Sequence, residues 1–374
     1  EMMKFNDLDL INSDLNHVII KNLKKVIKKN NFIFSQEVTT LENKLKILSN
    51  SKYAITTGSG TDSLILSLLC LDIKRNKKEI IIPAFSWLSV AEVVILLGFK
   101  PIYADVEIET FNIDIKDVAE KISKNTLAVI STSLFGRSCN LLKLKKICKI
   151  NNVIHIEDAA QNLGSKIKKK NSCSIADITC TSFFPTKNLG GFGDGGAVFT
   201  NQRKIYKKIL QLRNHGQKKY SYSDFVGINS RIGSIQAAVL NKKIKNFKKK
   251  INNQNKVYKS YQRFFKKNLI SGFPEYKSGE TLSQFNIMLK KRSKFIKELK
   301  KVNMEYKVYY PKPLYRQFNQ KIKKNMFLRN SENICKKIIS LPFNDNSKKR
   351  HNKVLNTLQV IIDKNKNYFF EKKK

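Results

Sequence analysis

The first 200 residues alternate short apolar runs, rich in β-branched side chains, with longer segments of helical periodicity. The short runs predict buried strands and the longer segments predict amphipathic helices. The expected strands cover residues 53–56, 79–83, 101–105, 127–131 and 153–158, and the expected helices cover residues 61–71, 86–97, 115–122 and 141–151. Because strands and helices take turns and the strands are almost wholly apolar, we predict an α/β fold with a mostly parallel sheet covered on both faces. A ligand of such a sheet binds at the carboxyl ends of its strands.

The pattern changes after residue 240. Residues 241–251 are rich in lysine and have apolar positions every three or four residues, which predicts a helix with one solvated face. Apolar runs at residues 287–289 and 306–310 follow. We therefore expect a large domain over residues 1–240 and a smaller α+β domain over residues 241–374.

The charge of the chain raises the question of nucleic-acid binding. Its 374 residues carry 72 Lys and Arg against 29 Asp and Glu, a net charge of +43. Most of the excess lies after residue 200, along helical segments, where solvated helix faces explain it. The sequence has no zinc-finger spacing, RNA-recognition signature or basic zipper. We therefore do not expect nucleic-acid binding as the main function, whereas an acidic small substrate suits the charge.

Targeting signals and metal-binding patterns are also missing from the sequence. No apolar run follows the charges at the N-terminus, and the most apolar stretch, residues 90–99, contains Glu92. We expect a cytoplasmic protein without membrane contact. The six cysteines form no CxxC pair and have no His at zinc-ligand spacing, so we expect reduced, mostly buried thiols and no metal site.

Two features that could carry chemistry directly follow predicted strands. Residues 57–62, Thr-Gly-Ser-Gly-Thr-Asp, form a glycine turn that opens a helix. Glycines let the backbone approach an anion, and the free N–H groups and dipole of a helix start favour phosphate. Glu157 and Asp158 end an apolar strand, where a carboxylate is costly unless a cation meets it. A plain helix cap would also explain Asp158.

The third feature is Lys187, a single lysine in the aromatic and glycine-rich segment 181–196. Gly191, Gly193 and Gly196 have the spacing of a dinucleotide fingerprint, but residues 197–200 predict a strand where that fingerprint opens a helix. A lysine in apolar surroundings has a lowered pKa, which Schiff-base chemistry with a carbonyl requires. A phosphate cradle, a carboxylate and a nucleophilic lysine are together what pyridoxal 5′-phosphate (PLP) needs.

These segments also resemble a known family, the nucleotide-sugar aminotransferases of the DegT/DnrJ/StrS type, which have PLP fold type I. The resemblance runs from about residue 5 to about residue 343. It rests on motifs at residues 58–62, 111–114, 157–161, 182–190, 193–197, 213–216 and 229–231. It implies a large PLP-binding domain with a mixed, mostly parallel sheet, followed by a small C-terminal domain.

The resemblance also implies roles for individual residues. Lys187 matches the lysine that forms the Schiff base, and Asp158 matches the partner of the ring nitrogen. Further cofactor-binding positions are Gly60, Thr61, Trp87, Gln161, Ser182 and Asn229. Trp87 matches an aromatic residue that stacks on the cofactor ring, although it could simply fill the core. Asn229 matches a residue that reaches the phosphate from the neighbouring subunit, which implies a homodimer with shared sites.

The implied reaction moves an amino group from L-glutamate to a keto-sugar on a nucleotide diphosphate. Residues 180–185, 226–231 and 310–314 are most similar to the branch acting on UDP-linked 2-acetamido-3-oxo-glucuronate in surface polysaccharide synthesis. Arg231, His215 and Tyr310 are implied on the substrate side. A uronate suits Arg231 because a guanidinium binds a carboxylate through two parallel hydrogen bonds, but dimer contacts or the L-glutamate carboxylate would also explain it. A neutral 4-keto-6-deoxy sugar is the alternative substrate.

Two other functions on the same scaffold are less consistent with the sequence. Related sugar dehydratases have histidine in place of the Schiff-base lysine, and Lys187 argues against that activity. A non-catalytic regulatory or nucleic-acid-binding protein is supported by the charge alone. Arg137 and Gly233 depart from the family pattern, and we expect them to alter the substrate side or the dimer contact.

Overall fold

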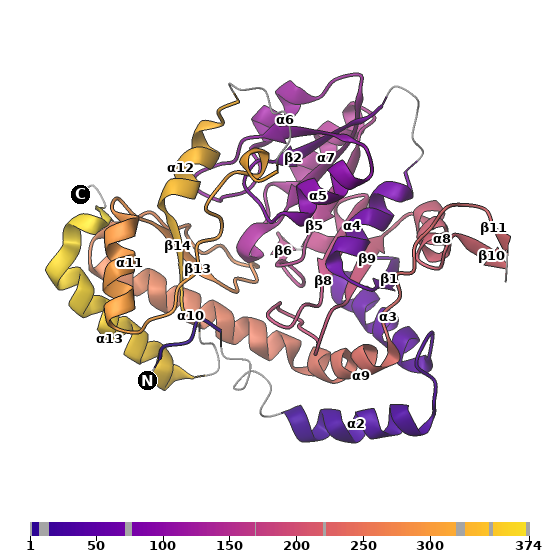
Figure 1. Ribbon diagram of the computed structural model, residues 1–374, viewed down its shortest axis with the longest axis horizontal. Helices are drawn as coiled ribbons and strands as arrows, with labels where there is room; N and C mark the ends of the chain where they lie inside the picture. The colour runs from indigo at the N-terminus through magenta and orange to yellow at the C-terminus, as the bar shows by residue number, and fades with distance from the viewer. Residues whose placement is uncertain are drawn as a thin grey trace.

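The computed structural model describes residues 2–6, 15–71, 77–168, 170–219, 222–318, 326–343 and 347–371. Figure 1 shows a large domain built on a central sheet, a smaller domain beside it, and helix α2 (Asn16–Lys28) lying at the edge of the molecule. In the described part of the chain, no helix is both long and apolar enough to span a bilayer.

A seven-stranded sheet in the order β1-β9-β8-β5-β4-β2-β3 forms the centre of the large domain. Its strands are β1 (Tyr53–Thr57), β2 (Glu79–Pro83), β3 (Lys100–Ala104), β4 (Thr126–Thr132), β5 (Ile154–Asp158), β8 (Ile178–Ser182) and β9 (Gly196–Thr200). Among them only β9 runs antiparallel to its neighbours. The predicted fold is confirmed, and each of the five expected strands forms within one residue of its expected ends.

Helices cover both faces of this sheet because its apolar side chains alternate between them. Ile80 and Ile82 share one apolar cluster with residues of α4, α5 and α8, and Ile81 shares another with residues of α6 and α7. The helices of the two faces are α4 (Gly60–Leu69), α5 (Ser89–Leu96) and α8 (Arg203–Leu212) on the first, and α3 (Gln36–Ser49), α6 (Ile115–Lys121), α7 (Leu141–Ile150) and α9 (Ser234–Lys243) on the second. Both faces are therefore buried, as parallel sheets require.

One expected helix starts later than its pattern predicts. The helix expected over residues 86–97 begins only at Ser89. The turn before it is held by other contacts, since the N–H of Ala84 donates to the carbonyl of Ala104 at 2.8 Å and Ser86 Oγ donates to Thr132 Oγ1 at 3.0 Å. Trp87 therefore lies in this turn, at the carboxyl end of β2.

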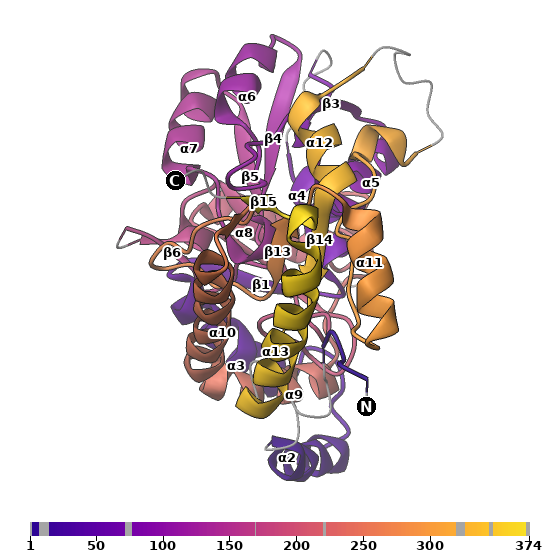
Figure 2. The same cartoon turned by 90° about the vertical axis from the view of Figure 1, so that its left-hand side faces the viewer.

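The smaller domain packs three helices around a two-stranded antiparallel sheet (Figure 2). Tyr261, Phe265, Phe285, Phe295 and Phe369 are fully buried in its core. Its elements are α10 (Phe247–Lys267), β12 (Ile270–Ser271), β13 (Phe285–Met288), α11 (Arg292–Lys301), α12 (Arg329–Lys337), β14 (Ile338–Leu341), α13 (Lys348–Asn365) and β15 (Phe370–Glu371). Met3 also joins this core, so the N-terminal segment packs with the C-terminal part of the chain. The division at residue 240 stays a prediction.

The lysine-rich segment after residue 240 differs from its expected form. It is divided between the end of α9, a 3-10 turn η4 (Ile244–Asn246) and the start of α10. Lys245, Lys248 and Lys249 are exposed as expected. Lys243 is not: it is buried, its ammonium lies 5.2 Å from the centre of the Phe192 ring, and burial lowers its pKa to about 8.

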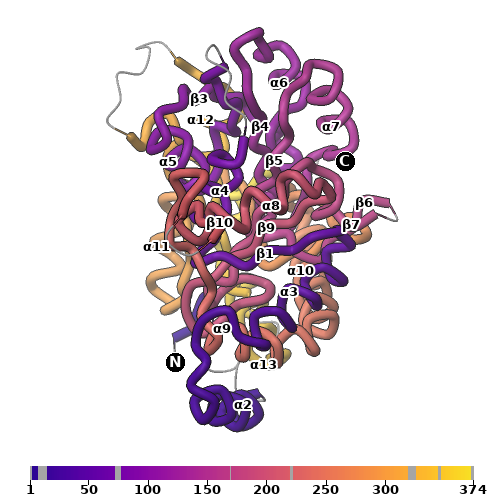
Figure 3. Tube along the Cα trace, turned by 90° about the vertical axis from the view of Figure 1, so that its right-hand side faces the viewer, coloured from indigo at the N-terminus to yellow at the C-terminus, as the bar shows by residue number. Residues whose placement is uncertain are grey.

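The remaining short elements connect the larger ones. They are β6 (Lys166–Ile167), β7 (Lys170–Asn171), β10 (Gln217–Lys219), β11 (Tyr222–Ser223), η2 (Leu134–Gly136), η3 (Ser172–Ser174), η5 (Leu314–Arg316) and η6 (Lys366–Tyr368). Figure 3 shows α2 below α9, with the β10-β11 hairpin beside α8. Near α2 and α9 several large apolar side chains are exposed, among them Ile20, Ile27, Phe34 and Ile235.

Candidate active site

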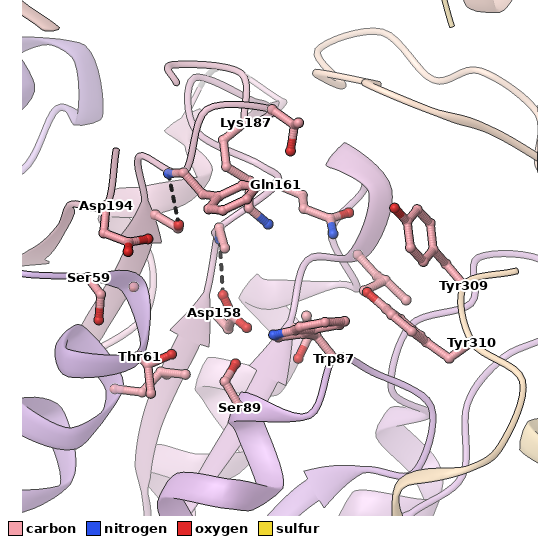
Figure 4. Close-up of a pocket in the computed structure, with 18 of the residues that line it drawn as sticks. Ser59, Thr61, Trp87, Ser89, Asp158, Gln161, Lys187, Asp194, Tyr309 and Tyr310 are labelled. Carbon is pink, nitrogen blue, oxygen red and sulfur yellow. Dashed lines mark hydrogen bonds between the residues drawn. The ribbon is translucent and has the colours of Figure 1, made fainter. Parts of the chain in front are cut away.

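A cavity of about 360 Å³ lies at the carboxyl ends of the strands and brings most of the predicted site residues together. Eight of them line it: Gly60, Thr61, Trp87, Asp158, Gln161, Ser182, Lys187 and Tyr310. Figure 4 shows Thr61, Trp87, Asp158, Gln161 and Lys187 around this cavity, with Tyr309 and Tyr310 at the side where Trp87 lies. Residues far apart in the sequence thus share one cavity.

The start of α4 forms one end of this cavity. Ser59 caps the helix, its side chain accepting the N–H of Asp62 at 3.0 Å. A Cβ on Gly60 would lie 2.7 Å from Cβ of Ser182, so any side chain here would displace the neighbouring strand end. The helix start and the side chains of Thr61 and Ser182 line the cavity together, and an arrangement of helix N-terminus and hydroxyls suits a phosphate.

Asp158 points into the cavity from the end of β5. Its Oδ1 accepts the N–H of Ala160 at 3.0 Å, and no helix begins in the described residues 159–164. The helix-cap explanation is therefore wrong, and the side chain instead anchors a short turn. Burial raises the pKa of Asp158, while that hydrogen bond and the charge of Lys187 act in the opposite direction. A cationic partner in the cavity would stabilise this carboxylate.

Glu157 turns to the other face of the sheet. Its carboxylate accepts hydrogen bonds from Ser133 Oγ at 2.5 Å, Asn162 Nδ2 at 3.3 Å and Thr179 Oγ1 at 3.3 Å. Burial raises the pKa of Glu157 to about 7, although the three hydrogen bonds act in the opposite direction. The two adjacent carboxyl groups therefore occupy separate environments, and only Asp158 is available to a ligand in the cavity.

Lys187 lies in the loop between β8 and β9. The loop is pinned at its base by the N–H of Phe183, which donates to the carbonyl of Gly195 at 2.7 Å. β9 then begins at Gly196, which confirms a strand where a dinucleotide fingerprint would place a helix. Burial of the Lys187 side chain lowers its pKa, and the negative charge of Asp158 partly opposes that shift. A buried lysine of this kind has a larger neutral, nucleophilic fraction than a surface lysine.

Trp87, Gln161 and Tyr310 form the wall next to these groups. The Trp87 side chain is 51% exposed, so it does not fill the core, and its ring centre lies 5.8 Å from that of Tyr310. Gln161 Oε1 accepts the N–H of Phe135 at 2.6 Å and its side chain also hydrogen-bonds Tyr310. Burial raises the pKa of Tyr310, so its hydroxyl stays protonated and can donate.

Three predicted site residues do not line this cavity. His215 and Asn229 are exposed, and Arg231 is half-buried, with Nη1 donating to Asn214 Oδ1 at 2.5 Å. The Arg231 guanidinium also lies 5.7 Å from the centre of the Phe34 ring. Ser230 links this segment to the cradle, because its hydroxyl accepts the N–H of Gly58 at 3.0 Å.

The two positions that depart from the family pattern have structural contacts. Arg137 is buried, with Nη2 3.2 Å from Glu280 Oε2 and Nη1 donating to the carbonyl of Glu275 at 2.7 Å. Gly233 precedes α9 as its N-cap. Neither lines the described wall of the cavity, so an effect of Arg137 on the substrate side would be indirect, through the segment that it holds.

Sequence reasoning missed part of the cavity wall. Tyr309, Gln284, Ser89, Thr132 and Asp194 line the cavity as well. Ser89 and Thr132 lie at a helix start and a strand end, a position that could have identified them. Gln284 lies in a segment without a motif, and only the packing of the smaller domain brings it here. In the described part of the chain no group of three or more His, Cys, Asp or Glu side chains could hold a metal ion.

Comparison with known proteins gives a consistent picture. A sequence profile of the DegT/DnrJ/EryC1/StrS aminotransferase family matches residues 13–359. The chain is 34% identical over 317 residues to a UDP-2-acetamido-2-deoxy-3-oxo-D-glucuronate aminotransferase of Pseudomonas aeruginosa. The aligned region covers 84% of this chain and 88% of that protein. The solved structure of a DegT DnrJ EryC1 StrS aminotransferase from Brucella abortus has a TM-score of 0.88 at 26% identity, over 96% of this chain and 99% of that one. NtdA from Bacillus subtilis, solved with bound cofactor PMP, has a TM-score of 0.86 at 26% identity, over 96% of this chain and 85% of that one.

Proposed function

The chain belongs to the DegT/DnrJ/EryC1/StrS aminotransferase family, and we propose that it uses PLP to move an amino group from L-glutamate to a keto-sugar carried on a nucleotide diphosphate. The observation that carries this proposal is the cavity in which half-buried Lys187 and buried Asp158 lie together beside the start of α4. The relative solved with PMP supports the choice of cofactor.

The residues present fit this cofactor. Gly60, Thr61 and Ser182 would hold its phosphate, since all three line the cavity and the missing side chain of Gly60 lets Ser182 lie directly against the start of α4. Asp158 would hold a proton on the ring nitrogen through a charge-assisted hydrogen bond. Trp87 would lie against the ring, and the NH2 group of Gln161, which also contacts Tyr310, would donate its second N–H to the cofactor because the amide oxygen is already bonded to Phe135.

Lys187 would act as the nucleophile and as the group that moves the proton. When bound, PLP supplies an electrophilic carbonyl and an electron sink for charge that develops on the donor carbon. Burial lowers the pKa of Lys187, which favours the neutral amine that would accept a proton and return it.

A homodimer with shared sites accounts for the residues that stand outside the cavity. Asn229, Arg231 and His215 are positioned on a surface next to exposed apolar side chains, including Phe34 and Val226. A second copy placed on this surface would bury those side chains and could bring these polar groups to the cavity of its partner. We propose that Asn229 completes the phosphate site and that Arg231 and His215 reach the substrate in this way.

The proposed substrate is UDP-linked 2-acetamido-3-oxo-glucuronate, in surface polysaccharide synthesis within the cytoplasm. The name of the Pseudomonas aeruginosa relative and the guanidinium of Arg231, which suits a uronate carboxylate, both support it. A neutral 4-keto-6-deoxy sugar nucleotide is the second candidate, and it has no use for that guanidinium.

Kinetics with both substrates would test the proposal. Wild-type enzyme and an Arg231→Lys variant should be compared on each keto-sugar with L-glutamate as donor. A loss confined to the uronate would support the substrate and the role of Arg231. Faster wild-type turnover of the 4-keto sugar would overturn the substrate, and purified protein without a visible absorption band after incubation with PLP would overturn the enzyme itself.

A further inference from the structure

Gln284 is a wall residue of the cavity whose amide has no assigned role. It directly precedes β13 and lines the same cavity as Lys187, together with Tyr309 and Tyr310 of the smaller domain. Its Oε1 is buried, yet no donor among the described residues forms a hydrogen bond with it. Gln161, on the facing wall, differs in this respect because its oxygen already accepts the N–H of Phe135.

The backbone of Gln284 is held in place from two sides. The preceding segment is tied to the large domain through Arg137, which contacts Glu280 at 3.2 Å, and through the N–H of Thr281, which donates to the carbonyl of Gly136 at 3.1 Å. Asn188, the neighbour of Lys187, donates from Nδ2 to the carbonyl of Thr281 at 3.0 Å. After Gln284 the chain enters β13, which pairs with β14 from Phe285 onward.

Because its backbone is anchored in this way, the position of Gln284 at the cavity indicates a contact with a ligand. A buried amide oxygen without a partner is unfavourable, and a surface glutamine would simply turn to water. Gln284 cannot move away, because the residues on both sides of it are fixed. Its amide can still turn about its last bond, so that a ligand in the cavity meets either the oxygen or the NH2 group.

We propose that Gln284 is a specificity-determining residue that hydrogen-bonds a neutral polar substituent of the sugar ring, a hydroxyl or an acetamido group near the ketone. This inference rests on the proposed function. Such a substituent both donates and accepts, so it satisfies either end of the amide. The carboxylates of L-glutamate and the phosphate of the cofactor only accept, and they leave the amide oxygen without a donor.

Gln284→Met is the informative variant, because methionine keeps the length and volume of the side chain without its hydrogen bonds. Gln254→Met is a matched control, since Gln254 in α10 also has a buried Oε1 without a partner among the described residues but does not line the cavity. The two half-reactions would be followed separately on PLP-loaded enzyme by the change of the visible absorption band, one with L-glutamate and one with the amino-sugar nucleotide product.

We expect Gln284→Met to lower kcat/KM for the amino-sugar half-reaction by about tenfold or more, because one hydrogen bond to the sugar is lost. The L-glutamate half-reaction should stay at the wild-type rate, and Gln254→Met should alter neither. An equal loss in both half-reactions would overturn the inference and make Gln284 a support of the cofactor. No loss in either half-reaction would also overturn it.

An analogue completes the test and separates this inference from the proposed function. With a sugar nucleotide that lacks the hydroxyl or acetamido group next to the reacting carbon, wild type and Gln284→Met should become equally slow. A difference that persists with every such analogue would contradict the contact. If wild-type enzyme reacts with L-glutamate but with no amino-sugar nucleotide, the proposed substrate class fails, and the role of Gln284 fails with it.

Discussion

Replacing Asp158 with asparagine isolates the charge at the base of the cavity. Asparagine has the same shape, and its Oδ1 can still accept the N–H of Ala160, which Asp158 holds at 3.0 Å. The turn after β5 should therefore keep its form, and the variant should fold and bind PLP. The change removes the negative charge of Asp158 beside Lys187. Asp158 is only 6% exposed, so water screens this charge little.

The size of the effect follows from that charge. A hydrogen bond to a charged group contributes on the order of 1.5–3 kcal/mol, so its loss should slow the reaction by roughly 10- to 150-fold at least. The real loss should approach complete inactivity, because a ring nitrogen without its proton withdraws fewer electrons from the donor carbon. Asp158 also raises the pKa of Lys187, so its replacement lowers that pKa and shifts the acid limb of the rate profile to lower pH.

The assay is the L-glutamate half-reaction, followed by absorbance from pH 5 to pH 9, with PLP content measured on the same sample. Glu157→Gln is the matched control, because it makes the same chemical change one residue earlier on the other face of the sheet. It should react at close to the wild-type rate. A fast Asp158→Asn enzyme with full PLP content would refute the reasoning and leave Asp158 as an anchor of the turn.

Three further predictions concern Lys187, the dimer and Glu157. Borohydride treatment of the PLP-loaded protein should fix a pyridoxyl group on the peptide that contains Lys187, and labelling of a different peptide would disprove the assignment. Mixing inactive Lys187→Ala and Asn229→Ala subunits should restore part of the activity by forming one intact site, and no recovery after demonstrated subunit exchange would argue against shared sites. Because burial raises the pKa of Glu157 from 4.5 to about 7, the folded protein binds this proton more tightly than the unfolded chain does. The free energy of unfolding should therefore fall by at most roughly 3 kcal/mol as the pH rises from 4.5 to about 7. In urea unfolding, Glu157→Gln should lack this part of the fall, and identical pH profiles of wild type and variant would contradict the prediction.

The elements of the sheet could be predicted from the sequence because both faces of each strand are buried. Strands such as β2, with three consecutive isoleucines, leave little doubt about their state, and the residues at their carboxyl ends then share an edge. Lys187 was recognisable because it stands alone among aromatic residues and glycines. The start of α5 was not, because the contacts that keep residues 84–88 out of the helix come from β3 and β4.

Tertiary contacts explain what the sequence could not predict in the candidate site. Lys243 has the sequence surroundings of a surface lysine, yet the Phe192 side chain covers it from the loop that carries Lys187. Gln284 has no motif around it and reaches the cavity only because the smaller domain is tied to the large one. Neither contact leaves a periodic pattern along the chain.

The cavity therefore has two walls with different origins. Groups assigned to the cofactor follow strands of one sheet, and their chemistry is set by burial and by the start of α4. Gln284, Tyr309 and Tyr310 come from the smaller domain, whose approach depends on contacts such as Arg137 with Glu280. Arg137 is also a position that the sequence resemblance leads us to expect as a departure from the family pattern. Under the proposed function, we expect substitutions at such inter-domain contacts to move the wall of Gln284, Tyr309 and Tyr310 while the cofactor wall stays in place, so that the choice of sugar changes without loss of the shared chemistry.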